Sequence, residues 1–138
     1  SKEQVRALAT EIVDFEGPIH VDRLTALIAR SFHVGKLHAK RQKAISHQLA
    51  QCDFVIDSDG FAWPPGLQAG EWVEFRPSSD LDRDFLHISP IELRNAKQFL
   101  AARHLDLDGE ELNRRVLQTF GRRRLVKAFS EHLRKAAS

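Results

Sequence analysis

Residues 16–63 read EGPIHVDRLTALIARSFHVGKLHAKRQKAISHQLAQCDFVIDSDGFAW, and this stretch decides the fold. Gly17-Pro18 ends the helix that precedes it, because proline cannot continue the helical hydrogen-bond ladder. A short extended segment, an apolar helical face, a turn at Gly35 and a second helix rich in lysine and arginine then follow. Asp59-Gly60 between two β-prone runs predicts a hairpin. With an amphipathic helix over residues 2–14 ahead of it, this order is that of a winged helix-turn-helix.

The rest of the chain predicts one more strand and a second group of helices. Residues 72–75 alternate like a strand, and the polar, acidic residues 77–84 are typical of a linker. Ser89-Pro90-Ile91-Glu92 predicts a capping box with proline at the first helical position. We therefore predict a mainly α (α+β) fold: a winged helix-turn-helix with a β-hairpin wing at 1–76, the linker at 77–84, and a helical second unit at 85–138.

A repeated pattern of apolar residues relates the two halves of the chain. With a shift of 88 residues, apolar positions of the first three-helix pattern fall on apolar positions of the second, and a four-residue shortening extends the match to the third helix. The second unit is then a degenerate winged helix without a hairpin. The alternative is a packed extension of the first unit, because unrelated amphipathic helices also align when they are slid along each other. The matching pairs are Val5/Leu93, Leu8/Ala96, Ile12/Leu100, Ile19/Leu107, Leu24/Leu112, Ile28/Val116, Phe32/Phe120, Ile45/Phe129 and Leu49/Leu133.

Composition indicates a globular domain with an uneven charge. The 138 residues are 42% hydrophobic and 29% charged, and the net charge is +2. Residues 1–52 carry eight Lys/Arg against five acids, residues 53–84 carry two against eight, and residues 85–138 carry eleven against six. Two basic regions thus flank an acidic middle, a distribution that says more about partners than the total does.

Other features of the sequence fit a reducing compartment. Cys52 is the single cysteine, so no internal disulfide can form, and no apolar run reaches the length of a membrane span. We expect a cytoplasmic protein without membrane contact. The chain starts at Ser1 and contains no methionine, so we expect it to be a piece of a longer protein.

The basic third helix is the main candidate site. No aspartate or glutamate occurs between Asp22 and Asp53. Cationic side chains on such a helix neutralise DNA phosphates and release counterions, whereas the alternative is a solvated face without a partner. The candidate DNA-binding residues here are Lys36, His38, Lys40, Arg41, Lys43 and His47.

Two further features bear on DNA contact. Arg122, Arg123 and Arg124 follow the second helix of the second unit and form either a second phosphate contact or a pairing site for the acidic residues 77–84. The hairpin tip, residues 58–60, is acidic, which argues against a wing in the minor groove. The aromatic residues of the hairpin, Phe61 and Trp63, are expected to close the core rather than to wedge between bases.

The sequence shows no signature of catalysis or of a bound cofactor. It contains no phosphate-binding Gly-Lys-Ser/Thr loop, no nucleophile elbow and no recognisable catalytic set. His47 and Cys52 lack the further ligands that a zinc site needs, and Asp53, Asp57 and Asp59 lack the pattern of a calcium loop. We expect no enzymatic activity, no metal and no cofactor.

Three segments of the chain resemble a known family. EGPIHVDRLTALIARSFHVGKLHAKRQKAISHQL (16–49), WVEFRP (72–77) and ISPIELRNA (88–96) resemble the uncharacterised C-terminal domain called domain of unknown function family 3320. That domain is found in large bacterial proteins related to superfamily 1 helicases, which often also carry an endonuclease-like module. The resemblance implies a bacterial cytoplasmic helicase context and transfers no catalytic residue.

Two functions remain open at this stage. The first is a non-catalytic accessory module of a larger helicase or nuclease, which binds duplex or forked DNA with weak sequence specificity. The second is a protein-protein or intramolecular docking module without nucleic-acid contact. Exposure of Trp72, Phe75 or Phe85 would favour the second.

Overall fold

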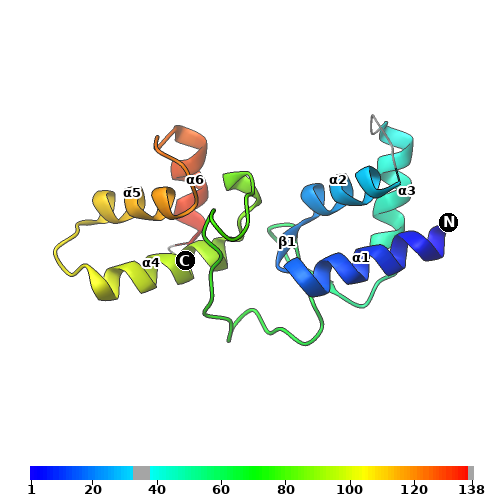
Figure 1. Cartoon of the computed structure of the whole chain (residues 1–138), viewed down its shortest axis with the longest axis horizontal. Helices are drawn as coiled ribbons and strands as arrows, with labels where there is room; N and C mark the ends of the chain where they lie inside the picture. The colour runs from blue at the N-terminus through cyan, green and yellow to red at the C-terminus, as the bar shows by residue number, and fades with distance from the viewer. Residues whose placement is uncertain (33–37, 137–138) are drawn as a thin grey trace. The chain divides into compact units, whose positions relative to one another are not determined.

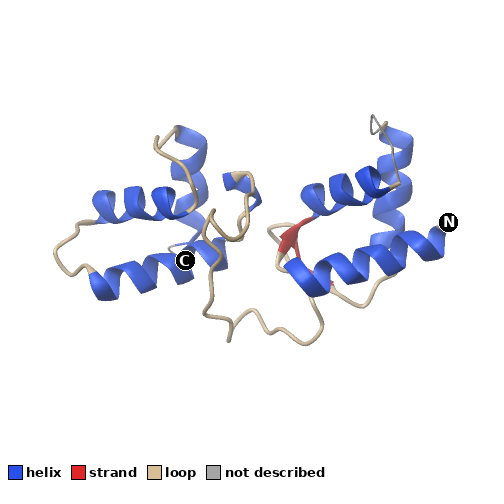
Figure 2. Ribbon diagram, in the orientation of Figure 1, coloured by secondary structure: helices blue, strands red, loops and turns tan. Residues whose placement is uncertain are grey.

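The computed structural model describes residues 1–32 and 38–136, and the chain divides into two compact units. The first unit spans Ser1–Gly70 and the second spans Glu71–Ser138. Among the described residues, each unit has three α-helices and the strands belong to the first unit (Figures 1 and 2). Within the described part of the chain, no helix combines the length and the apolar character that crossing a bilayer requires.

The first unit is a winged helix. It contains, in chain order, α1 (Lys2–Glu16), β1 (Ile19–His20), α2 (Val21–Ser31), α3 (Ala39–Leu49), β2 (Val55–Ile56) and β3 (Phe61–Trp63). The central strand of the small sheet is β3, which pairs antiparallel with both β1 and β2. The predicted order of helices, short strand and hairpin is confirmed, and the fold is mainly helical with a small antiparallel sheet.

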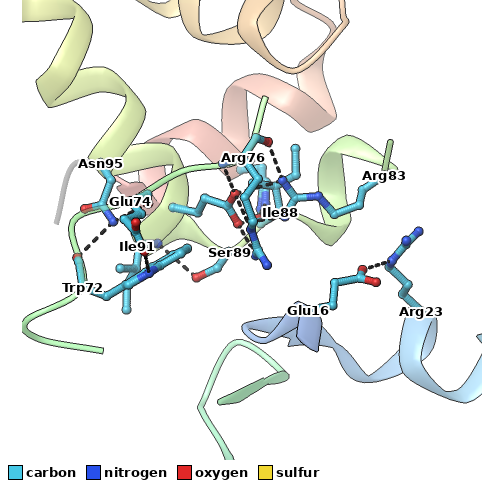
Figure 3. A network of polar contacts seen from close by, with 12 residues as sticks. Glu16, Arg23, Trp72, Glu74, Arg76, Arg83, Ile88, Ser89, Ile91 and Asn95 are labelled. Carbon is cyan, nitrogen blue, oxygen red and sulfur yellow. Dashed lines mark hydrogen bonds and ion pairs between the residues drawn. The ribbon is translucent and has the colours of Figure 1, made fainter. Parts of the chain in front are cut away.

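Local interactions fix the helices of this unit. Ser1 caps α1 in a capping box with Gln4. The buried carboxylate of Glu16, at the end of α1, forms an ion pair with Arg23 of α2, so the two helices are joined at this corner (Figure 3). α1 packs against both α2 and α3. The core between them consists of Ala9, Val13, Ile19, Leu24, Ile28, Leu49, Phe54 and Ala62.

The hairpin is organised by one carboxylate. Oδ1 of Asp57 accepts hydrogen bonds from the backbone N–H groups of Asp59 and Phe61, and Oδ2 accepts one from the indole N–H of Trp63 at 2.9 Å. Gly60 has a φ of +86°, a left-handed conformation that glycine adopts without strain. Phe61 is 1% exposed and Trp63 is 4% exposed, so the expectation that these aromatics close the core is confirmed.

Replacing Asp57 with alanine should destabilise the first unit by about 2–3 kcal/mol, because buried donors would lose their acceptor. The matched control is Asp59→Ala at the same hairpin tip. Asp59 is exposed, so this change should stay within about 0.5 kcal/mol. Urea denaturation followed through the NMR signals of the first unit measures the change in its free energy of unfolding for both variants. Equal effects of the two substitutions would contradict the role assigned to Asp57.

The second unit is a three-helix arrangement. It contains a 3₁₀ turn, η1 (Phe85–His87), and the helices α4 (Pro90–Arg103), α5 (Gly109–Thr119) and α6 (Lys127–Ala136). α4 packs against both α5 and α6. Their shared core consists of Phe85, Ile88, Leu93, Ala96, Val116, Leu117, Phe120, Leu133 and Ala136.

The prediction of a strand at residues 72–75 is wrong. The segment has no regular secondary structure, and its backbone is hydrogen-bonded to a side chain of α4 instead. The amide of Asn95 donates to the carbonyl oxygens of Trp72 and Glu74 at 3.0 and 2.9 Å (Figure 3). Alternating residues predicted a sheet partner, but the carbonyl groups are satisfied by Asn95.

The predicted boundary also differs from the structure. The division falls after Gly70, and residues 77–84 lie within the second unit rather than between the two. Arg83 in this segment is 4% exposed, and the N–H of Ser78 donates to the carbonyl of Thr119 at 3.0 Å. An acidic composition predicted a solvated linker, but one buried arginine and one backbone hydrogen bond attach the segment to the helices.

The helix boundaries of the two units follow the predicted shift of 88 residues. Ser1 caps α1 and Ser89 caps α4, while Phe32 and Phe120 follow the last residues of α2 and α5. In Figure 1, the third helix of each unit stands across the first two. These correspondences support an internal duplication.

Candidate nucleic-acid interface

α3 presents a cationic stripe opposite its buried side. Leu49 and Gln48 are buried, and Ile45 packs against the core. Lys40, Lys43 and His47 recur at three- and four-residue spacing, so they lie on one stripe of the helix. His38 and Arg41 are also exposed but lie off this stripe, and Arg41 borders a groove beside Ile45 and Gln48. The exposed basic residues of α3 and its cap are together named the α3 face: His38, Lys40, Arg41, Lys43 and His47.

The α3 face is not neutralised by the residues around it. α3 carries no acid in its first turn, and its capping residue His38 makes no side-chain capping hydrogen bond. Among the described residues, no ion pair is found for Lys40, Arg41 or Lys43. The predicted contact Lys36 and the predicted turn at Gly35 lie outside the described residues. The charges that are described therefore face solvent and are available to a polyanion.

Neutral polar side chains accompany these charges. Gln42 and Ser46 are exposed on α3, and with Ala39, Lys40 and Lys43 they line an open surface depression of about 610 Å³. Amide and hydroxyl groups donate to phosphate and sugar oxygens as well as to base edges.

The wing is a poor partner for DNA. Ser58 and Asp59 at its tip are exposed, so the tip carries negative charge toward solvent. The strand at the edge of the sheet, β2, exposes Val55 (64%) and Ile56 (41%). The negative charge at the tip disfavours contact with phosphate, whereas α3 exposes several positive charges.

The structure separates the three arginines of the second unit. The guanidinium of Arg122 donates to the carbonyl oxygen of Arg83 at 2.8 Å, so Arg122 fastens the turn before α6. Arg123 and Arg124 are exposed. None of the ion pairs found among the described residues joins them to the acidic residues 77–84. Arg123 and Arg124 thus expose their charges to solvent.

The sequence reasoning missed a buried ionic network in the second unit. Glu92 of α4 is fully buried, and its carboxylate accepts hydrogen bonds from Arg83 at 2.7 Å and from Arg76 at 2.8 Å. Figure 3 shows both arginines. The carboxylate also accepts a hydrogen bond from the backbone N–H of Arg76 at 2.7 Å. Ser89 caps α4 alone, through the N–H of Ile91, so the capping box predicted for Glu92 is wrong.

The charge of Glu92 is stabilised by its partners. Burial by itself raises the pKa of the Glu92 carboxyl, but hydrogen bonds and positive charge from Arg83 and Arg76 outweigh burial and hold that pKa below its usual value. Arg76 and Arg83 are the only basic residues in 53–84, and this isolation in an acidic stretch is the signal that could have pointed to a buried partner.

Cys52 has a local role. Its Sγ lies 3.4 Å from the carbonyl oxygen of Gln48, one turn back, and the residue packs against the core of the first unit. His47 is exposed on α3.

Comparison with known proteins adds one finding. The family model described as "Protein of unknown function (DUF3320)" matches residues 1–43. The match covers α1, β1, α2 and the first residues of α3, and it supports the sequence resemblance over this part of the chain. Neither the curated proteins nor the solved structures give a significant match.

Proposed function

We propose that the chain is a non-catalytic accessory DNA-binding module, whose α3 face contacts the phosphates of duplex or forked DNA. The observation that carries this proposal is the exposed α3 face, with no ion pair to Lys40, Arg41 or Lys43 among the described residues. In a winged helix-turn-helix, the helix in this position enters the major groove. Phosphate contacts from lysine and arginine give affinity that falls steeply with salt and depends weakly on sequence.

The parent protein is proposed to be a bacterial cytoplasmic helicase or nuclease. The support for this context is the sequence resemblance, of which residues 1–43 match the family model. ATP hydrolysis and DNA cleavage belong to other domains in this proposal, and the module would also contact those domains.

An NMR titration tests the proposal. A short duplex and a forked DNA are added to the chain at low and at physiological salt, and we expect salt-sensitive shifts that cluster on residues 38–48. The hairpin tip serves as an internal reference in the same spectra. No shifts at low salt with either DNA would overturn the proposal.

A docking module is the second candidate, and one observation favours it. Val55 and Ile56 form an exposed apolar pair on an edge strand, and such an edge can pair with another chain. Exposure of Trp72, Phe75 or Phe85 would also have favoured docking, but Trp72 and Phe85 are buried and Phe75 is partly buried against the core. Shifts that centre on β2 with a protein partner, and that persist in high salt, would favour this function over DNA binding.

A further inference from the structure

The third helices of the two units share a register that extends beyond apolar residues. Residues 43–49 read KAISHQL and residues 127–133 read KAFSEHL, so four of the seven positions are identical. Burial follows the same alignment: Gln48 and His132 are both buried, and Leu49 and Leu133 are each 3% exposed. α6 is therefore the counterpart of α3, offset by the four-residue shortening.

This register aligns cationic residues of the second unit with residues of the α3 face. Lys127, the first residue of α6, corresponds to Lys43, and Arg124 aligns with Lys40 but lies in the non-helical segment before α6. All four are exposed, and Arg123 adds a further exposed charge beside Arg124. The ion pairs found among the described residues include none with Arg123, Arg124 or Lys127.

The turn that carries these arginines is held by the body of the second unit. Gly121 has a φ of +78°, and the backbone N–H of Arg122 donates to the carbonyl of Leu117 at 2.8 Å. The guanidinium of Arg122 bonds to the carbonyl of Arg83, which itself pairs with Glu92. A fixed turn lets charged side chains meet a ligand without an ordering cost in the backbone.

We propose that Arg123, Arg124 and Lys127 form a second DNA-phosphate contact, so that the chain engages the DNA backbone through both units. This inference rests on the proposed function of the α3 face and extends it to the counterpart helix. Two sequence differences between the aligned segments make the second contact weaker than the contact of the α3 face. Leu125 packs against the core where Arg41 is exposed, and Glu131 brings a negative charge where His47 stands.

The test measures affinity for a duplex of about 30 base pairs across a range of salt concentrations, with the whole chain and fluorescence anisotropy. Arg123→Gln/Arg124→Gln/Lys127→Gln should weaken binding at least about tenfold. It should also reduce the slope of log K against log salt by about 2 to 3, because each lost phosphate contact removes about 0.9. Arg123→Lys/Arg124→Lys keeps the charges and should bind like the wild type.

The matched control is Arg103→Gln/Arg114→Gln/Arg115→Gln, which removes the same charge from exposed positions on α4 and α5. It should change affinity less than about threefold. Equal losses of affinity in the two triple variants would overturn this inference and leave the α3 face unaffected. Wild-type affinity of Arg123→Gln/Arg124→Gln/Lys127→Gln would do the same. An additional variant, Lys40→Gln/Arg41→Gln/Lys43→Gln, that binds like the wild type would instead overturn the α3 face itself. Circular dichroism confirms that each variant is folded.

Discussion

Replacing Lys40, Arg41 and Lys43 together with glutamate should lower the affinity of the chain for duplex DNA at least about a hundredfold at 0.1 M salt. Each lost phosphate contact reduces the slope of log K against log salt by about 0.9. Extrapolated from about 1 M to 0.1 M salt, this change of slope lowers the affinity almost tenfold. Three lost contacts multiply to a few hundredfold, and the added negative charge repels the phosphates further. Fluorescence anisotropy with a labelled duplex measures the change.

Two comparisons decide whether the loss is specific to α3. Reversing Arg103, Arg114 and Arg115 in the second unit changes the net charge by the same amount and should have a much smaller effect. The loss in the α3 variant should also be the same for duplexes of different sequence, because phosphates carry no sequence information. Similar losses in both variants would mean that only total charge matters, and that α3 is not the binding element.

Features that depend on neighbouring residues could be predicted from the sequence. The apolar spacing of α1 and α2 and the Asp59-Gly60 turn are local patterns, and the structure contains the predicted helices and hairpin. Exposure of Lys40 and Lys43 follows from the same helical period, since Ile45 and Leu49 must face the core. The fold of the first unit and the placement of its candidate site therefore followed from short-range rules.

Features that depend on distant partners could not be predicted in this way. Glu92 follows Ser89-Pro90 in the pattern of a capping box, and nothing local distinguishes a capping carboxylate from one that binds two arginines. Likewise, Asn95 replaces the strand partner that residues 72–75 were predicted to have. In each case a side chain of α4 reaches a segment 9 to 23 residues earlier in the chain.

The buried network predicts the largest effect on stability. Glu92→Gln should destabilise the second unit by about 3–5 kcal/mol, because removal of one partner leaves the buried guanidinium of Arg83 uncompensated. A small unit has a total stability near the low end of about 5–15 kcal/mol, so much of it would be lost. Residue-resolved hydrogen exchange measures the effect, and we expect loss of protection in α4 to α6.

Two variants show whether the charge, rather than the packing, is responsible. Glu110→Gln removes an exposed partner of Arg114 within α5 and should change stability by less than about 0.5 kcal/mol. Adding Arg83→Met to Glu92→Gln removes the uncompensated charge and should restore part of the lost stability. If adding Arg83→Met lowers the stability of Glu92→Gln further, instead of restoring part of it, the uncompensated charge of Arg83 is not the cause of the stability loss.

The Glu92 network should also give stability a defined pH dependence. Because the pKa of Glu92 in the folded chain is below its ordinary value of 4.5, its stabilising contribution is complete above about that pH and is lost as the pH falls through the lowered pKa. Glutamine at this position cannot ionise, so the stability gap between the wild type and Glu92→Gln should be constant near neutral pH and shrink below about pH 4.5. Other carboxylates titrate alike in both proteins and cancel in the difference. Urea denaturation followed through NMR signals of the second unit measures this gap, and parallel curves down to strongly acid pH would show that Glu92 is not held ionised by its arginines.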